Sequence, residues 1–290
     1  LAELTHLNGS RLKQFDVGSV EQAEAAVALL PDTWRVDTVK RSKRSTNPPP
    51  PYNTASLQQD ASRTMGISPS RVMRLAQALY EGLPLGGGEE NVALITYMRT
   101  DGIEMSSDGI NGARRYISKA FGSEEKWLPS SPRLFKRKKR NAQEAHEAVR
   151  PVDLMLTPAS LIGKIGGQEL RLYELIWRRA IASQMASAIH EQLAISLVPE
   201  GGEGTAQART SGSRLLSPGY KALTSQPRIK AAKAEEEEEE EEGEAEGGGE
   251  EEEEEEGGSN GLNPLLEGLG EGDTLSTLER LPSQKFTEPP

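Results

Sequence analysis

The sequence has 290 residues, of which 35% are hydrophobic, and it contains no cysteine. This length suits two domains or one elaborate domain, the lack of cysteine excludes disulfides and thiolate metal sites, and no apolar run approaches the ~18 residues of a membrane span. The formal net charge is −11, but 17 glutamates lie between Glu235 and Glu256. Removing those 17 negative charges from −11 leaves +6, so the rest of the chain is basic and attracts anionic partners.

The first 46 residues predict one helix followed by one strand. Ser19 is the expected N-cap of a helix over 20–30, which ends at Pro31 because the residue before a proline is pushed out of the helical region. Alternating apolar and polar residues over 34–39 predict a strand with one buried face. The basic cluster at 40–44 suits a solvated loop and a phosphate contact equally well.

The four prolines at 48–51 form a stiff, extended connector and predict a domain boundary. Two helices are expected after it. Thr54 is the expected cap of the first, and Gly66 ends it. Ser68 and the proline after it mark the start of the second. The apolar face of this second helix consists of Val72, Leu75, Ala76 and Leu79.

The most informative stretch covers residues 92–101. Four apolar residues at 92–95 predict a short buried strand, after which polar residues begin abruptly. On a strand, Tyr97 and Arg99 lie on the same side of the pleat. A phenol can act as a nucleophile, and a guanidinium offers a fork of donors that suits a phosphate. The pair therefore suggests attack by Tyr97 on a phosphodiester held by Arg99; the alternative is a half-buried strand tyrosine beside a solvated arginine.

The middle of the chain predicts a helix over 107–121, weakened by two internal glycines, and then a very basic run, Lys136-Arg-Lys-Lys-Arg140. That run suits a solvated loop or attraction to a phosphate backbone. It leads into a predicted helix on which His146 and Arg150 stand four residues apart and share a face. A lone histidine is more often a structural hydrogen-bonding group than a catalytic one.

The last third of the chain predicts one core helix and several strands. A broad apolar face at 170–181 predicts a buried helix, and strand patterns follow at 192–198, loosely at 219–223, and at 272–278. Residues 231–261 have almost no apolar surface to offset ordering entropy, and their like charges repel, so they are predicted to be disordered. This acidic insert is either a tolerated surface loop or a tether that competes for the basic surface.

Four ordered stretches of this sequence resemble the bacterial-type type IA DNA topoisomerases. Ile95-Thr-Tyr-Met-Arg-Thr-Asp101 resembles the active-site signature of that family. The other matching stretches cover residues 47–59, 142–151 and 172–177. Gly102 departs from the family pattern, since many relatives have Ser or Thr there. Four motifs in the expected order are far more specific than one.

The resemblance implies a role for each candidate site residue. Tyr97 is the expected nucleophile, which becomes linked to a 5′ phosphate, and Arg99 is expected to hold the scissile phosphate. His146 and Arg150 are implied to contact DNA, and Thr96 and Asp101 to support the site. The further DNA-binding candidates are Lys136, Arg137, Lys138 and Lys139.

The resemblance also implies a multidomain α+β fold, in which a helix-rich, tyrosine-bearing domain is inserted in a mainly β arch domain. The expected arch segments are 1–46, 189–230 and 262–290, the helical domain is 47–188, and the disordered acidic insert is 231–261. The chain begins with Leu and stops at Pro290, so we expect a piece of a longer protein.

Relatives of this type use Mg²⁺ bound by a separate acidic domain, and this sequence shows no strand-borne Asp-x-Asp pair that could replace it. We therefore expect these 290 residues alone to be inactive in full relaxation. The expected partner is single-stranded or negatively supercoiled DNA, bound by a monomer with no membrane contact. The expected location is intracellular and with DNA: a plastid, mitochondrion or nucleus of a eukaryote, or otherwise the bacterial cytoplasm.

Two other functions fit parts of the sequence. One is a non-catalytic, single-strand DNA-binding module, although aromatic residues are only 4% of the chain and a stacking platform is poorly supplied. The other is a tyrosine recombinase, whose dispersed Arg and His residues fit the ordered motifs badly. A tyrosine adduct on a 5′ phosphate favours the topoisomerase, one on a 3′ phosphate favours the recombinase, and no adduct favours simple binding.

Overall fold

The computed structural model describes residues 1–13, 16–85, 91–135, 147–201, 206–229 and 264–283. The chain divides into two compact units. The first is formed by Leu1–Arg44, His190–Leu216 and Glu252–Pro290, and the second by Ser45–Ile189 and Ser217–Glu251. Each unit has a hydrophobic core of its own. The predicted combination of helices and strands is confirmed.

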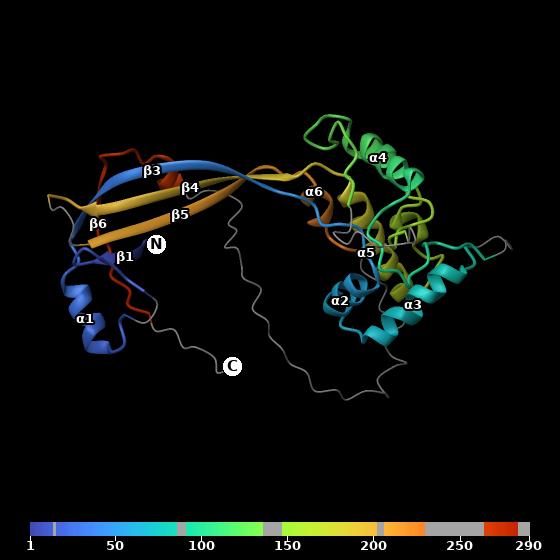
Figure 1. Cartoon of the computed structure of the whole chain (residues 1–290), viewed down its shortest axis with the longest axis horizontal. Helices are drawn as coiled ribbons and strands as arrows, with labels where there is room; N and C mark the ends of the chain where they lie inside the picture. The colour runs from blue at the N-terminus through green and yellow to red at the C-terminus, as the bar shows by residue number, and fades with distance from the viewer. Residues whose placement is uncertain (14–15, 86–90, 136–146, 202–205, 230–263, 284–290) are drawn as a thin grey trace, which may run out of the picture. The chain divides into compact units, whose positions relative to one another are not determined.

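The first unit is built on a six-stranded sheet with the order β2-β1-β5-β4-β3-β6 (Figure 1). β1 pairs antiparallel with both β2 and β5, and β3 pairs antiparallel with β6. Every second residue near the start of β3 is buried, because side chains alternate between the two faces of a strand. The elements of this unit are β1 (Glu3–Leu7), β2 (Ser10–Arg11), α1 (Val20–Ala28), β3 (Thr33–Thr46), β4 (Ala188–Pro199), β5 (Ala206–Ser217), α7 (Pro264–Glu267) and β6 (Thr274–Ser276).

Sequence patterns located α1 and three of the six strands of this unit, but not β1, β2 or β5. Ser19 caps α1 as expected, since its hydroxyl accepts the N–H of Gln22 at 3.3 Å. The strands expected at 34–39, 192–198 and 272–278 are confirmed by β3, β4 and β6. The basic cluster at 40–44 lies on β3 and not in a loop, because that strand continues to Thr46 beside the long strand β4.

The second unit is a cluster of helices around α5, which contacts α2, α3, α4, α6 and a short 3-10 helix (Figure 1). The apolar face predicted at 170–181 is buried on α5, so that prediction is confirmed. The elements of this unit are α2 (Thr54–Met65), α3 (Pro69–Glu81), α4 (Ser107–Phe121), the 3-10 helix η1 (Pro158–Leu161), α5 (Gly167–Ser183) and α6 (Lys221–Thr224).

The first two helices of this unit start and stop largely where their capping residues predict. The Ser68 hydroxyl caps α3 by accepting the N–H of Arg71 at 3.3 Å, and all four predicted core positions of α3 are buried. Asn53, and not Thr54, caps α2: it accepts the N–H of Ser56 at 2.9 Å, and the Ser56 hydroxyl accepts the N–H of Asn53 at 3.1 Å. Thr54 is the first residue of α2, and its hydroxyl bonds to another segment.

One strand prediction in this unit is wrong. Residues 219–223 form a turn followed by the helix α6, because Gly219 has a φ of +48° and the N–H of Tyr220 donates to the Ala186 carbonyl oxygen at 2.9 Å. α6 then packs against α5 in the helical unit, although the predicted arch segment 189–230 included these residues. The predicted acidic insert lies outside the described residues.

Candidate active site

The short strand predicted at 92–95 does not form, and the backbone bends at Thr96, Met98 and Arg99. Among the described residues, two isolated bridges pair this segment, from Val92 to Leu83 and from Ile95 to Pro151. Pro151 has no N–H to donate, so a continuous ladder cannot form at that point. Leu94 and Ile95 are nevertheless buried as expected, which anchors the segment in the helical core.

The residue before Tyr97 is held by the segment 148–152. The Thr96 hydroxyl donates to the Ala148 carbonyl oxygen at 2.8 Å and accepts the N–H of Arg150 at 3.0 Å, while the Thr96 N–H donates to the Arg150 carbonyl oxygen at 2.9 Å. Three hydrogen bonds on one residue leave its backbone little freedom. Thr96 therefore anchors the backbone immediately before Tyr97.

The residue after Tyr97 is held by the start of α2. The Thr54 hydroxyl lies 2.7 Å from the Met98 carbonyl oxygen and accepts the N–H of Thr100 at 2.8 Å. The Met98 side chain is fully buried. The backbone on both sides of Tyr97 is thus fixed by hydrogen bonds and burial.

Tyr97 and Arg99 both face solvent between buried neighbours. The Tyr97 side chain is 50% exposed, Arg99 is exposed, and Met98 and Thr100 are buried. Within the described part of the chain, the Arg99 guanidinium makes no hydrogen bond or ion pair. Both groups are therefore available to a ligand, although the strand that was predicted to place them on one side is absent.

A second tyrosine lies against the candidate nucleophile. The rings of Tyr80 and Tyr97 are 5.3 Å apart between centroids, with an interplanar angle of 66°, which is an edge-to-face arrangement. Tyr80 is on the last turn of α3 and is 38% exposed. The sequence gives no signal for this contact, since 17 positions separate the two residues.

Arg150 differs from Arg99 in its surroundings. It is 9% exposed, and its guanidinium donates from Nε to Glu147 Oε1, from Nη1 to the Pro151 carbonyl oxygen at 2.7 Å, and from Nη2 to Ser106 Oγ at 3.1 Å. The Glu147 carboxylate also accepts the N–H of Ser106 at 2.8 Å. This cluster ties the start of α4 to the segment that holds Thr96.

Burial raises the pKa of Glu147, but hydrogen bonds from Arg150 and Ser106 outweigh that effect and leave the pKa below its usual value. Glu147 is therefore ionised at neutral pH. Glu147 and Arg150 are three residues apart and have opposite charges, which is the feature of the sequence that could have indicated this ion pair.

The helix predicted to carry His146 and Arg150 does not extend over the described residues 147–150. Glu147 and Val149 form isolated bridges to Glu104 and Tyr52, so pairing with distant segments overrides local helix propensity. His146 and the basic run from Lys136 to Lys139 lie outside the described residues. Asp101 is exposed beside the Tyr97 segment.

Gly109, one of the two glycines expected to weaken α4, makes room for Arg150. A Cβ added to Gly109 would lie 2.6 Å from Arg150 Nε, which is closer than real Cβ contacts come. The absent side chain therefore permits the guanidinium to pack against the first turn of α4. The glycine has a packing reason in addition to its cost in helix propensity.

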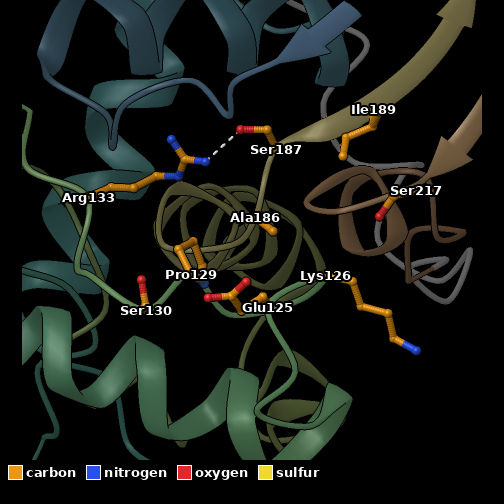
Figure 2. Close-up of a pocket in the computed structure, with 9 residues that line it drawn as sticks. All are labelled: Glu125, Lys126, Pro129, Ser130, Arg133, Ala186, Ser187, Ile189 and Ser217. Atoms are coloured by element: carbon orange, nitrogen blue, oxygen red, sulfur yellow. Dashed lines mark hydrogen bonds between the residues drawn. The ribbon is translucent and has the colours of Figure 1, made fainter. Parts of the chain in front are cut away.

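An open cavity of about 540 Å³ lies elsewhere in the helical unit. Arg133 lines it and donates from Nη2 to the Ser187 hydroxyl at 2.6 Å (Figure 2). Its Nε donates to the Met185 carbonyl oxygen at 2.9 Å. Burial lowers the pKa of Arg133. No residue of 92–101 or 147–152 lines this cavity, so it is not part of the candidate active site.

Metal ligands do not gather in the part of the chain that the structure describes. No group of three or more His, Asp or Glu side chains there could hold an ion. The Mg²⁺ implied by the family resemblance therefore has no ligand set among these residues. Within the same ranges, no helix is both long and apolar enough to cross a membrane.

Comparison with known proteins identifies the family. A family model described as DNA topoisomerase matches residues 3–290. The chain belongs to the DNA topoisomerase family. This confirms the relationship that the four sequence motifs predicted, and the segment that carries Tyr97 is the one that resembles the family's active-site signature.

Individual topoisomerases match most or all of the chain. DNA topoisomerase 1 of Rickettsia felis is 38% identical over 290 residues, which is 100% of this chain and 33% of the relative. DNA topoisomerase 1 of Xylella fastidiosa is 38% identical over 226 residues, 77% of this chain and 27% of the relative. The full-length topoisomerase I structure from Thermotoga maritima has a TM-score of 0.65 at 25% identity, covering 95% of this chain and 36% of that one. The chain thus spans about a third of the length of these relatives.

Proposed function

We propose that this chain is the central, strand-cleaving region of a type IA DNA topoisomerase. The enzyme would cut one DNA strand, pass the other strand through the gap, and reseal the break without ATP. The observation that carries this proposal is a half-exposed Tyr97 beside an exposed Arg99, on a backbone held on both sides. Family membership supports it.

In the cleavage step, the Tyr97 phenolic oxygen attacks the phosphorus of one phosphodiester. The new bond joins that oxygen to phosphorus, the bond from phosphorus to the 3′ oxygen breaks, and the tyrosine carries the 5′ phosphate. The phenol gives up its proton, and the leaving 3′ oxygen takes one up. Religation is the reverse reaction, in which the 3′ hydroxyl attacks the phosphotyrosine, so the step needs no external energy source.

Arg99 would stabilise the negative charge that grows on the phosphate oxygens during attack. Its guanidinium is exposed and has no partner among the described residues, so within that part of the chain its donors are open to a phosphate. Donors aimed at developing charge typically contribute ~10²–10³ in rate. Thr96 supports this arrangement by fixing the backbone, and we propose that Asp101 orients neighbouring groups.

We further propose that His146 and the basic run Lys136, Arg137, Lys138 and Lys139 contact the DNA backbone, as expected from their charge. Arg150 holds the segment beneath Tyr97 through its bonds to Glu147 and Ser106. To contact a phosphate directly, Arg150 would have to give up its hydrogen bond to Glu147 or to Ser106.

For the whole protein, we propose a helical domain inserted in a mainly β arch domain; the two units of the described chain support this division. Mg²⁺ would be bound by a separate acidic domain outside this chain, and no step above runs through the metal. The proposed partner is single-stranded or negatively supercoiled DNA, bound by a monomer. The bacterial relatives support a location with cellular DNA.

A covalent-adduct assay tests the proposed function. The full-length protein is incubated with a labelled single-stranded oligonucleotide and quenched with denaturant, and the linked species is analysed. We expect a 5′-phosphotyrosyl adduct that disappears in Tyr97→Phe. Tyr116→Phe is the matched control, because Tyr116 packs against Trp177 at a ring distance of 4.7 Å, away from the Tyr97 segment, and should leave the adduct unchanged.

Two results would contradict the proposal. An adduct on a 3′ phosphate would indicate recombinase chemistry, and oligonucleotide binding without any adduct would indicate the non-catalytic binding module. Complete plasmid relaxation by these 290 residues alone, with Mg²⁺ present, would contradict the need for a separate metal-binding domain.

A further inference from the structure

The Tyr97 side chain has more freedom than its backbone. Hydrogen bonds to Thr96 and burial of Met98 fix the main chain on both sides, but the ring between them is half exposed. An exposed side chain can occupy several rotamers, and only some would aim the phenolic oxygen at a phosphorus atom. A ring contact that restricts those rotamers therefore bears directly on reactivity.

The only ring found in contact with Tyr97 within the described residues is that of Tyr80. The centroids are 5.3 Å apart with a 66° interplanar angle, which lies in the favourable range for edge-to-face aromatic pairs. No hydrogen bond joins the two phenols among the described contacts, so the interaction is one of ring faces and edges. It leaves the Tyr97 hydroxyl available for chemistry.

Tyr80 itself is held in a fixed place relative to the Tyr97 segment. The preceding residue, Leu79, is fully buried, and its carbonyl oxygen accepts the N–H of Leu94 at 2.8 Å. Leu83 and Val92 exchange two further backbone hydrogen bonds, at 3.1 and 3.0 Å. The end of α3 is thus joined to the chain a few residues before the nucleophile.

The glycine between these anchors allows the close approach. Gly82 has a φ of +102°, and a Cβ there would lie 3.0 Å from backbone atoms of Asn91 and Val92. A side chain at this position would therefore push the end of α3 away from the segment. The geometry keeps the Tyr80 ring and the Tyr97 ring together as one local structure.

We propose that Tyr80 is a positioning residue that restricts the Tyr97 ring to the orientation used for attack on the phosphodiester. This inference rests on the proposed cleavage function of Tyr97. The ring of Tyr80 does this through its edge-to-face contact and its hydroxyl is not required, so Phe can replace it and an aliphatic side chain cannot. Tyr80 would act on the rate of cleavage and not on the affinity for DNA.

A different role for the same side chain is stacking on a DNA base, because Tyr80 is 38% exposed. Stacking contributes to binding, so its loss would weaken DNA affinity and leave the rate at saturating DNA unchanged. A positioning role therefore predicts a slower cleavage rate with an unchanged Kd, and a stacking role predicts a raised Kd with an unchanged rate at saturating DNA.

The experiment compares full-length wild type, Tyr80→Leu and Tyr80→Phe. Three quantities are measured: the single-turnover rate of adduct formation at saturating oligonucleotide, the Kd for the same oligonucleotide by fluorescence anisotropy, and the Tm. We expect Tyr80→Leu to slow adduct formation about two- to tenfold, the range that follows from the strength of an aromatic pair. The Kd and Tm should remain close to wild type, and Tyr80→Phe should restore the rate to within about twofold.

Several outcomes would overturn the inference. Tyr80→Leu could cleave as fast as wild type, it could raise the Kd at an unchanged saturated rate, or Tyr80→Phe could be as slow as Tyr80→Leu. If Tyr80→Leu fails to fold, Tyr80→Gln replaces it, since that side chain has no ring and its polar end suits the partly exposed position. If wild type itself forms no adduct, the proposed function of Tyr97 fails, and that result is distinct from all of these.

Discussion

Two arginines at the Tyr97 segment, one on it and one packed against it, have opposite surroundings. Arg99 is exposed and has no partner among the described residues, whereas Arg150 is 9% exposed and donates to a carboxylate, a hydroxyl and a carbonyl oxygen. A guanidinium whose donors are already used holds a structure together, and one whose donors are unused can bind a ligand. The difference separates the group available for chemistry from the group that supports it.

The largest effect should come from the exposed arginine. We expect Arg99→Ala to lower the rate of adduct formation by ~10²–10³, because it removes a donor to developing charge, and to leave the free energy of unfolding unchanged. Single-turnover cleavage and urea unfolding measure the two quantities. Arg115→Ala is the matched control, since it removes an exposed positive charge from α4. If both variants lost the same factor in rate, Arg99 would act only through its general positive charge and not as a specific phosphate ligand.

The buried arginine should behave in the opposite way. Arg150→Ala leaves Glu147 without its partner, and breaking a buried ion pair is strongly destabilising. Breaking a fully buried pair costs ~3–5 kcal/mol. Because the Glu147 side chain is 29% exposed, we expect a smaller loss, about 2–3 kcal/mol in the free energy of unfolding. Urea unfolding measures it. A variant as stable as wild type would show that the Arg150 cluster does not hold the site together.

A smaller effect should follow from filling the space at Gly109. The added methyl group of Gly109→Ala would meet Arg150 Nε at 2.6 Å, and such overpacking costs ~1–3 kcal/mol, against a gain of ~1 kcal/mol in helix propensity. We expect a net loss of about 1 kcal/mol by urea unfolding. In the control Gly112→Ala, the nearest atom is the flexible Leu154 Cδ1 at 3.2 Å, and that variant should be at least as stable as wild type.

The smallest effect concerns pH. The pKa of Glu147 in the folded chain lies below its ordinary value of 4.5. Between the folded and the unfolded pKa, the unfolded chain therefore binds more protons than the folded chain. The resulting stability is present above about pH 4.5 and is lost as pH falls through the lower, folded pKa. Urea unfolding at several pH values should show a shallower acid-side loss in Glu147→Gln than in wild type. Identical slopes would mean that Glu147 does not carry this linkage.

Local patterns predicted the helices well, because capping and periodicity act over a few residues. Ser68 and Pro69 start α3, Gly66 ends α2, and α4 covers the residues expected for it. The strand predicted to place Tyr97 and Arg99 on one side does not form, so their exposure depends on the burial of Met98 and Thr100 around them. The sequence by itself therefore determined the longer helices α1 to α5, the family and the pair of residues at the centre of the candidate site.

Only the tertiary structure decided what surrounds that pair. The Thr54 hydroxyl, the Arg150 cluster and the Tyr80 ring reach the Tyr97 segment from positions far along the chain. Residues 147–150 became extended and not helical because their backbone groups pair with Tyr52, Thr96 and Glu104. Such pairings depend on which distant segments meet in the folded core, and no local pattern of residue types records that.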